Sequence, residues 1–175
     1  MFNLASWKFN LRHNTEKVEQ PEFGKMINGQ GLGLVSKLRY GICRMSFNGC
    51  EVIAVHNALV YLEKPEALKD IAFYMERFRL LMGFFGCNVF MLGRALRHFG
   101  AECPRIKSTE AAEAFIITFW TKLPFLSPIH TVFCVRTAGG IKVYNRYNNV
   151  GNMYLCADVE EVAGKRRPIS IYKIK

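Results

Sequence analysis

The feature that most constrains the fold is an almost uninterrupted apolar run at residues 52–62, VIAVHNALVYL. Its apolar positions 52, 53, 55, 59, 60 and 62 cover nearly the whole circumference of a helix with 3.6 residues per turn. A helix that is apolar all round is buried on all sides, whereas a surface helix is apolar along one stripe. We therefore expect a central helix around which the rest of the chain packs.

Two further helices are predicted after this central one. Pro65 stands where a second helix can begin, because the first helical position does not need an N–H. Residues 66–80 then place apolar and charged side chains on opposite sides of a helix. A third helix is expected from about residue 88 to residue 98, ended by Gly100. A short helix is expected in STEAAEA (108–114), behind a hydroxyl N-cap.

The second half of the chain has the composition of β-strands. Four segments are rich in β-branched and aromatic residues and are bounded by Gly, Pro or Asn, namely 114–120, 130–136, 141–145 and 168–174. Helices that come first and strands that come later favour an α+β fold, with the helices packed on a C-terminal antiparallel sheet. Near the N-terminus, Trp7, Phe9 and Leu11 alternate with polar residues, which predicts a half-buried strand.

A length of 175 residues predicts a single domain, with an N-terminal arm (1–39), a helical half (40–100) and an antiparallel β half (101–175). The N-terminus lacks the apolar stretch of roughly 7 to 15 residues that marks a secretory signal. The longest uncharged apolar stretch, residues 80–93, is shorter than the roughly 20 residues that span a bilayer. Both observations predict a cytoplasmic protein without a transmembrane segment.

The net charge of +10 would suit an anionic partner such as nucleic acid. The basic residues are scattered, however, and the one dense cluster at 165–167 fits a solvated turn, so a nucleic-acid partner is not expected. The cysteines show no C-x-x-C pairing and stand at positions 43, 50, 87, 103, 134 and 156. We expect reduced thiols, no metal and no cofactor.

Cys50 stands at the start of the central helix, behind the polar lead-in SFNG. Unpaired N–H groups and the helix dipole stabilise negative charge at a helix N-terminus, which lowers the pKa of a cysteine placed there. None of the other cysteines has such a position. Cys50 is therefore a candidate nucleophile, and the alternative is a cysteine that is simply buried in the core.

A nucleophilic thiol needs a base, and the base needs an orienting partner. His130 follows the Pro-containing approach PFLSPI and opens a predicted strand, from which its ring can project into a cleft; the alternative is a strand-end histidine without a partner. If TAGG (137–140) closes a hairpin with an even-numbered loop, residues 136 and 141 pair, and Asn145 becomes the same-face diagonal neighbour of His130. The Asn145 side chain would then accept the imidazole N–H and fix the tautomer, whereas an odd loop without a bulge would put the two on opposite faces.

The order and spacing of these residues resemble the papain-like cysteine peptidases, in particular the peptidase domains that cleave bacteriocin leader peptides after a double glycine and their stand-alone relatives. The corresponding segments, within residues 40–150, are NGCEVIAVHNALVYL, FFGCNVFMLGRALRHFGAE, PFLSPIHTVFCV and GGIKVYNRYNN. The resemblance implies a papain-like fold, with Cys50 as nucleophile, His130 as general base and then acid, and Asn145 as the orienting residue. It also implies a peptide or protein substrate and a thioester intermediate.

Two positions depart from the family pattern. Papain-like enzymes usually carry a glutamine six residues before the nucleophile to help hold the oxyanion, and here that residue is Arg44. A glycine commonly follows the cysteine in the bacteriocin-processing type, and here it is Glu51. Asn48 is the nearest amide and is a candidate oxyanion donor, a role whose loss costs roughly a hundred- to a thousandfold in rate. The sequence thus predicts a cysteine peptidase or related thiol hydrolase, with a degenerate papain-like module that binds a peptide without cutting it and a basic binder of nucleic acid or an anionic surface as alternatives.

Overall fold

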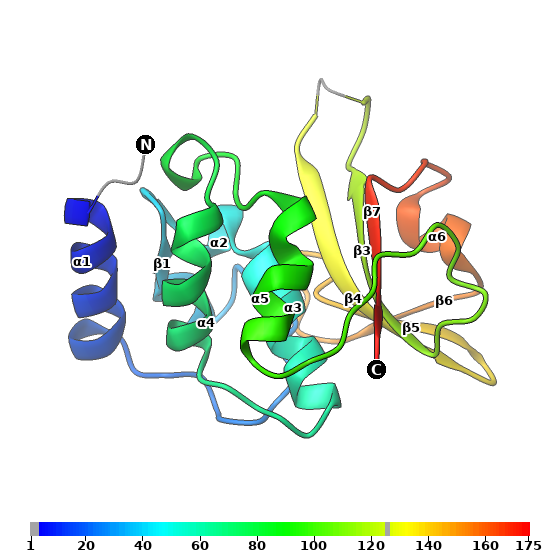
Figure 1. Ribbon diagram of the computed structural model, residues 1–175, viewed down its shortest axis with the longest axis horizontal. Coiled ribbons are helices and arrows are strands. Elements are labelled where there is room, and N and C mark those ends of the chain that lie inside the picture. The colour runs from blue at the N-terminus through cyan, green and yellow to red at the C-terminus, as the bar shows by residue number, and fades with distance from the viewer. Residues whose placement is uncertain (1–3, 125–126) are drawn as a thin grey trace.

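The computed structural model describes residues 4–124 and 127–175, and Figure 1 shows its helices beside an antiparallel sheet. The α-helices are α1 (Leu4–Arg12), α2 (Met45–Asn48), α3 (Cys50–Tyr61), α4 (Leu68–Met75), α5 (Leu92–His98) and α6 (Val159–Ala163). The strands are β1 (Arg39–Tyr40), β2 (Cys43–Arg44), β3 (Ala114–Trp120), β4 (Ile129–Thr137), β5 (Gly140–Tyr144), β6 (Tyr154–Cys156) and β7 (Ser170–Ile174). The predicted α+β class is confirmed. Over the described ranges, no helix has the length and apolar character needed to cross a membrane.

The main sheet has the strand order β6-β5-β4-β3-β7, and every neighbouring pair is antiparallel. The four strands predicted from composition correspond to β3, β4, β5 and β7. β6 was not predicted, because its residues 154–156 are too few to show a pattern. β1 and β2 form a separate two-stranded ribbon.

The predicted central helix is α3, which is buried from Cys50 to Leu59. It packs on β4, and its side chains share one apolar core with α4, α5 and one face of the sheet. The opposite face of the sheet forms a second core with α6. The prediction of a helix surrounded by the rest of the chain is confirmed.

The flanking helices are shorter than predicted. The helix expected over 66–80 comprises α4 and a 3-10 turn, Glu76–Phe78, and the helix expected over 88–98 comprises the 3-10 turn Val89–Met91 and α5. The prediction of a helix in STEAAEA is wrong, because residues 109–111 form only turns and bends. The Glu113 carbonyl accepts a hydrogen bond from the Arg136 N–H at 2.7 Å. The end of this segment is therefore bonded to strand β4 and not to a helical turn.

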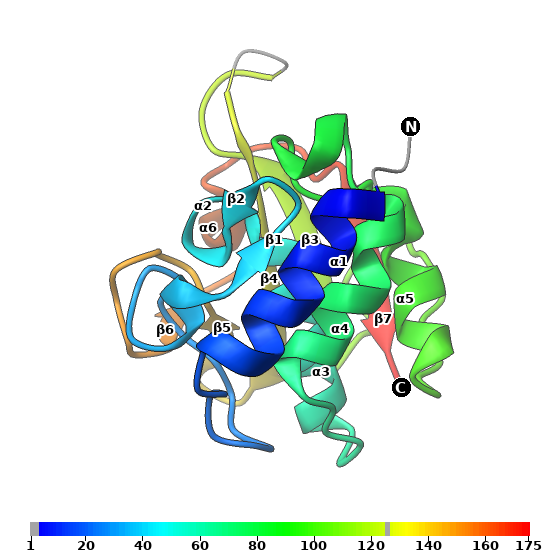
Figure 2. The ribbon, with the colours of Figure 1, turned by 90° about the vertical axis from the view of Figure 1, so that its left-hand side faces the viewer.

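The N-terminal strand prediction is also wrong, because residues 4–12 form α1, which lies beside α4 (Figure 2). The Trp7 ring stacks on Phe73 at 4.4 Å between centroids. The inward positions of the N-terminal segment are Trp7, Asn10 and Asn14, which have helical spacing, whereas Phe9 is 56% exposed. The apolar alternation was misleading because Asn10 and Asn14 are buried, whereas Phe9 and Leu11 are exposed.

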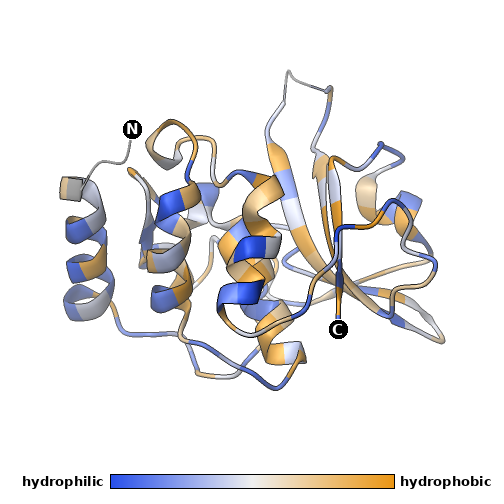
Figure 3. Ribbon diagram, in the orientation of Figure 1, coloured by the Kyte–Doolittle hydropathy of each residue, from blue (hydrophilic) through white to orange (hydrophobic). Residues whose placement is uncertain are grey.

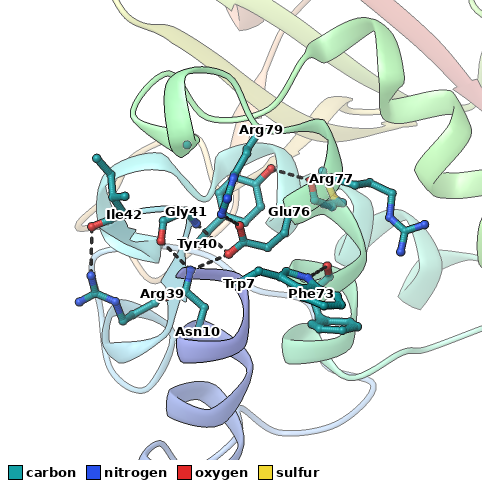
Figure 4. Close-up of polar contacts among 12 residues, drawn as sticks. Trp7, Asn10, Arg39, Tyr40, Gly41, Ile42, Phe73, Glu76, Arg77 and Arg79 are labelled. Carbon is teal, nitrogen blue, oxygen red and sulfur yellow. Dashed lines mark hydrogen bonds and ion pairs between the residues drawn. The ribbon is translucent and has the colours of Figure 1, made fainter. Parts of the chain in front are cut away.

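Asn10 belongs to a buried polar network that joins α1 to the ribbon and to the end of α4 (Figure 4). The Glu76 carboxylate accepts hydrogen bonds from Asn10 Nδ2 at 2.6 Å and from the Gly41 N–H at 2.9 Å. It also forms an ion pair with Arg79, and both side chains are almost completely buried. The network fixes the chain immediately before the loop at residues 80–86, one wall of the candidate site.

The short helix α6 carries side-chain caps at its N-terminus that the sequence analysis missed. Asp158 Oδ1 accepts the Glu161 N–H at 2.8 Å, and Glu161 Oε2 accepts the Ala157 N–H at 2.7 Å. Asp158→Ala removes the cap and is expected to lower the free energy of unfolding by about 1 kcal/mol, measured by urea denaturation. Asp158→Ser keeps a capping oxygen and is expected to retain most of the stability. Equal losses in the two variants would contradict the capping role.

Candidate active site

Cys50 is the first residue of α3, as predicted, and its side chain is 7% exposed. Gly49 precedes it at the junction with α2, where a Cβ atom would lie 2.6 Å from the Met45 carbonyl oxygen. The glycine therefore lets α2 pack directly against the start of α3. This close packing places the thiol at the helix N-terminus.

The Cys50 thiol is protonated at neutral pH. Its Sγ donates a hydrogen bond to Glu51 Oε2 at 3.3 Å. Burial raises the pKa of Cys50 well above its usual range, and the charge of Glu51 raises it further, against a lowering effect of the Thr131 backbone N–H. In the free protein, desolvation and the neighbouring carboxylate thus raise the pKa of Cys50 by more than its position at the N-terminus of α3 lowers it.

Glu51 is 1% exposed although it carries a titratable carboxyl group. Burial raises the pKa of Glu51 to about 7, against smaller lowering effects of nearby backbone N–H groups and of the Cys50 thiol. Its second carboxyl oxygen, Oε1, has no hydrogen-bond partner in the part of the chain that the structure describes. The residue that follows Cys50 is therefore a buried acid in direct contact with the thiol.

His130 is the second residue of β4, and its Nε2 lies 2.8 Å from the backbone carbonyl oxygen of Asn145. A carbonyl oxygen only accepts, so Nε2 carries the proton in the neutral ring and Nδ1 is the basic nitrogen. Burial lowers the pKa of His130, and the charge of Arg146 lowers it further, while backbone carbonyls of Asn145 and Arg146 oppose the change. The imidazole is therefore neutral at neutral pH. Its ring also meets that of Phe119 edge-on, at 6.0 Å between centroids.

Asn145 lies next to His130 as the predicted hairpin register requires, because Arg136 pairs with Ile141 and Phe133 with Tyr144. The contact uses the main chain and not the amide. Asn145 has a φ of 59°, so the chain turns away after β5 and its carbonyl points at the imidazole. The side-chain amide of Asn145 forms two hydrogen bonds with Gln30, both at 3.0 Å. Asn145 Oδ1 accepts from the Gln30 backbone N–H, and Asn145 Nδ2 donates to Gln30 Oε1. The orienting contact is thus a backbone one.

The role of oxyanion donor predicted for Asn48 does not fit this geometry. Asn48 Nδ2 donates to the Tyr40 carbonyl oxygen at 2.9 Å and also to the carbonyl oxygen of Gly83. An amide has two N–H hydrogens, and both are used. Asn48 therefore ties the start of α3 to the ribbon and to the loop at 80–86, and its side chain has no hydrogen left for a substrate.

One cavity of about 740 Å³ lies at the start of α3 and of β4, and it is lined by Cys50, His130 and Asn48 but not by Asn145. Its polar lining includes Gln30, Asn48, Cys50, Glu51 and His130. Among the described residues, no hydrogen bond joins the Cys50 thiol to His130. The two residues thus line one cavity without a hydrogen bond between them.

The sequence analysis missed Gln30, which holds Asn145. Gln30 is buried and also donates from Nε2 to the Ser46 carbonyl oxygen at 3.1 Å. The sequence feature that could have revealed Gln30 is the glycine on either side of it. Gly29 and Gly31 let the backbone pack closely against the segment after β5.

The other three histidines have structural contacts away from the cavity. His13 contacts the Lys37 carbonyl oxygen at 3.2 Å. His56 is buried in α3, and its two ring nitrogens meet backbone carbonyl oxygens at 3.0 and 3.2 Å. His98 stacks on Tyr74 at 3.6 Å between ring centroids. His130 is the histidine that can serve a thiol in this cavity.

Comparisons with protein-family models, with curated proteins and with solved structures gave no match. What the site can do therefore follows from its own residues. Within residues 4–124 and 127–175, no group of three or more His, Cys, Asp or Glu side chains is arranged to hold a metal ion. All six cysteines are free thiols.

The electrostatics of Cys50 give a first test. Iodoacetamide at about pH 8 is expected to alkylate Cys43, the half-exposed cysteine, faster than Cys50 in the free protein. Glu51→Gln removes the charge that opposes the thiolate, so it should lower the pKa of Cys50 and speed its alkylation. Peptide mass spectrometry of each cysteine measures the rates, with buried Cys134 as the internal control. A Cys50 that is alkylated first in the unmodified protein would contradict the protonated, buried thiol.

Proposed function

We propose that this protein is a papain-like thiol hydrolase, most simply a cysteine peptidase, with Cys50 as nucleophile and His130 as general base. The single observation that carries the proposal is that Cys50, at the N-terminus of the buried helix, and His130, at the start of β4, line the same cavity. A central helix headed by cysteine and packed on an antiparallel sheet is also the arrangement that the resemblance implies. A cytoplasmic setting, where the thiols stay reduced, is part of this proposal.

The reaction starts from a neutral thiol and a neutral imidazole. As Cys50 Sγ attacks the carbonyl carbon of an amide, Nδ1 of His130 takes the thiol proton. The tetrahedral intermediate collapses when the same proton passes to the leaving amine, which breaks the C–N bond and leaves a thioester on Cys50. A water molecule, activated by His130, then hydrolyses the thioester and restores the thiol.

A backbone group would hold the developing oxyanion in place of Asn48. The N–H groups in the first turn of a helix have no intrahelical acceptor, and that of Cys50 belongs to the first turn of α3. An oxygen at this position would also benefit from the positive end of the helix dipole. Asn145 would act as a positioning residue through its carbonyl, which keeps the His130 ring in the reactive tautomer.

A peptide is the substrate class that fits the apolar wall of the cavity. Phe47, Phe84 and Phe85 are more than half exposed and line it, and Figure 3 colours the loop at residues 80–86 mostly hydrophobic. Such aromatic walls accept the side chains of an extended peptide. A leader peptide of the double-glycine type is the finer form of this proposal, and it rests on the resemblance alone.

The proposal is tested with p-nitrophenyl acetate, a small activated ester that needs no knowledge of the natural substrate. A Cys43→Ser background removes the half-exposed thiol. The expected result is a burst of p-nitrophenol, together with one acetyl group on the peptide that contains Cys50. Cys50→Ala in the same background should abolish both signals. An unchanged burst in Cys50→Ala would overturn the mechanism.

A second candidate function is a catalytically degenerate module that binds a peptide. The observation that favours it is the raised pKa of Cys50 beside Glu51, because a thiol held neutral by its neighbour is a poor nucleophile. This candidate predicts that Cys50 is not acetylated even at saturating ester. The burst experiment therefore separates the two functions.

A further inference from the structure

The carboxylate of Glu51 is the one feature of the cavity that the proposed chemistry leaves unused. Its Oε1 is buried without a hydrogen-bond partner, and its residue lines the cavity. In the described part of the chain, no lysine or arginine forms an ion pair with it. A buried carboxylate normally pairs with a cation or a set of donors, because an ionised group out of water is otherwise strongly destabilised.

The carboxylate lies against Gly86 at the wall of the cavity. Gly86 stands over it, and a Cβ atom at Gly86 would lie 2.9 Å from both carboxyl oxygens of Glu51. A side chain at position 86 would therefore clash with the Glu51 carboxylate. Gly86 lines the same cavity as Glu51.

The aromatic wall next to Glu51 also suits a cation. Phe84 lies 5.6 Å from Phe47 and 5.3 Å from Phe85 between ring centroids. Aromatic faces attract ammonium and guanidinium groups, and they pack at the same time on the apolar stem of a lysine or arginine side chain. Glu51 and the three rings thus place a buried carboxylate and an apolar aromatic wall on the same cavity.

We propose that this cavity binds the basic side chain of a lysine or arginine in a peptide, with Glu51 as its counter-ion. As a binding site, the assignment stands on the cavity itself; as a statement about the substrate, it rests on the proposed hydrolase function. A neutral side chain of the same shape would leave the Glu51 charge unpaired, so the cavity discriminates by charge.

Binding of the cation would also change the thiol. Since the Glu51 charge opposes ionisation of Cys50, a guanidinium that neutralises this charge removes the opposition. The nucleophile is then easiest to ionise when a basic side chain occupies the cavity. The ligand that the site selects thereby promotes the reaction of the adjacent thiol.

The charge state of Glu51 sets the pH dependence of binding. The titratable groups that face it are Cys50 on α3, Tyr40 on β1 and Cys87 after the loop, and burial raises the pKa of all three, so they are uncharged at neutral pH. Glu51, whose pKa is raised to about 7, must lose its proton to pair with a cation. The affinity should fall about tenfold per pH unit below 7 and level off above it.

The test compares two ligands that differ in charge but have nearly the same shape, Nα-acetyl-arginine amide and Nα-acetyl-citrulline amide. Calorimetry or NMR titration of the unmodified protein is expected to show binding of the arginine compound that is about 30-fold or more tighter than binding of the citrulline compound. Equal affinities would overturn the proposal, and this comparison does not depend on any variant folding.

Two variants localise the effect. Glu51→Gln should reduce the preference for arginine to near unity, and Glu102→Gln, which removes a carboxylate that is 79% exposed, should leave it unchanged. A preference that survives in a folded Glu51→Gln protein would assign the cation to another group and overturn the proposal. Arginine preference without acetylation of Cys50 would retain the cation site and reject the hydrolase. Acetylation of Cys50 without arginine preference would retain the hydrolase and reject the cation site.

Discussion

Replacing His130 by alanine is expected to slow the release of p-nitrophenol about 10²- to 10⁴-fold, because the Cys50 thiol is then without its proposed general base. The effect should be large since the thiol is protonated in the free protein and needs a proton acceptor to react. Stopped-flow absorbance on the Cys43→Ser background measures the burst rate.

The matched control for this experiment is His13→Ala, because His13 is also a histidine but contacts Lys37 far from the cavity. Its burst rate should equal that of the parent protein. Added imidazole should restore part of the rate in His130→Ala, which a merely structural role of His130 would not allow. A burst that is equally fast without His130 would assign the base to another group.

The second large effect concerns stability. Glu76→Ala is expected to lower the free energy of unfolding by about 3–5 kcal/mol, the range measured when one partner of a buried ion pair is removed. The carboxylate joins Arg79, Asn10 and the Gly41 N–H, so its loss leaves buried donors without their acceptor (Figure 4). Urea denaturation followed by circular dichroism measures the change.

An exposed ion pair in the same part of the chain provides the comparison. Arg12 and Glu16 form a salt bridge at 2.9 Å, but their side chains are 75% and 52% exposed. Glu16→Ala is therefore expected to cost about 0–1 kcal/mol, because water screens such pairs. Similar losses in Glu76→Ala and Glu16→Ala would show that burial does not strengthen the Glu76 network.

The helices and strands that could be predicted from the sequence are those whose residue pattern reflects burial in the apolar core. α3 is apolar all round because protein surrounds it, and the strands β3, β4, β5 and β7 have the β-branched and aromatic composition of a two-sided core. α1 could not be predicted in this way, because its inner face contains polar Asn10, which is satisfied by a carboxylate from a residue 66 positions away. The periodicity of residues within one segment cannot reveal a hydrogen-bond partner that lies so far away in the sequence.

The same distinction applies to the site. Position in the chain was enough to single out Cys50 and His130, which the fold brings to one cavity. The role of the Asn145 carbonyl depends on a positive φ after β5, and the state of the thiol depends on which way the Glu51 side chain turns. Both are set by tertiary packing, so residue identity alone could not reveal them.

The contacts that hold Asn145 have a consequence for how the protein is made. Its hydrogen bonds to Gln30 and Asn28 join residues 115 and 117 positions apart, so they close very long loops. A growing chain on the ribosome contains the complete helix with Cys50 well before it contains the turn that fixes the imidazole. The proposed nucleophile and the proposed base can consequently be brought together in their final geometry only after synthesis has passed residue 145, so an incomplete chain is expected to lack the proposed activity.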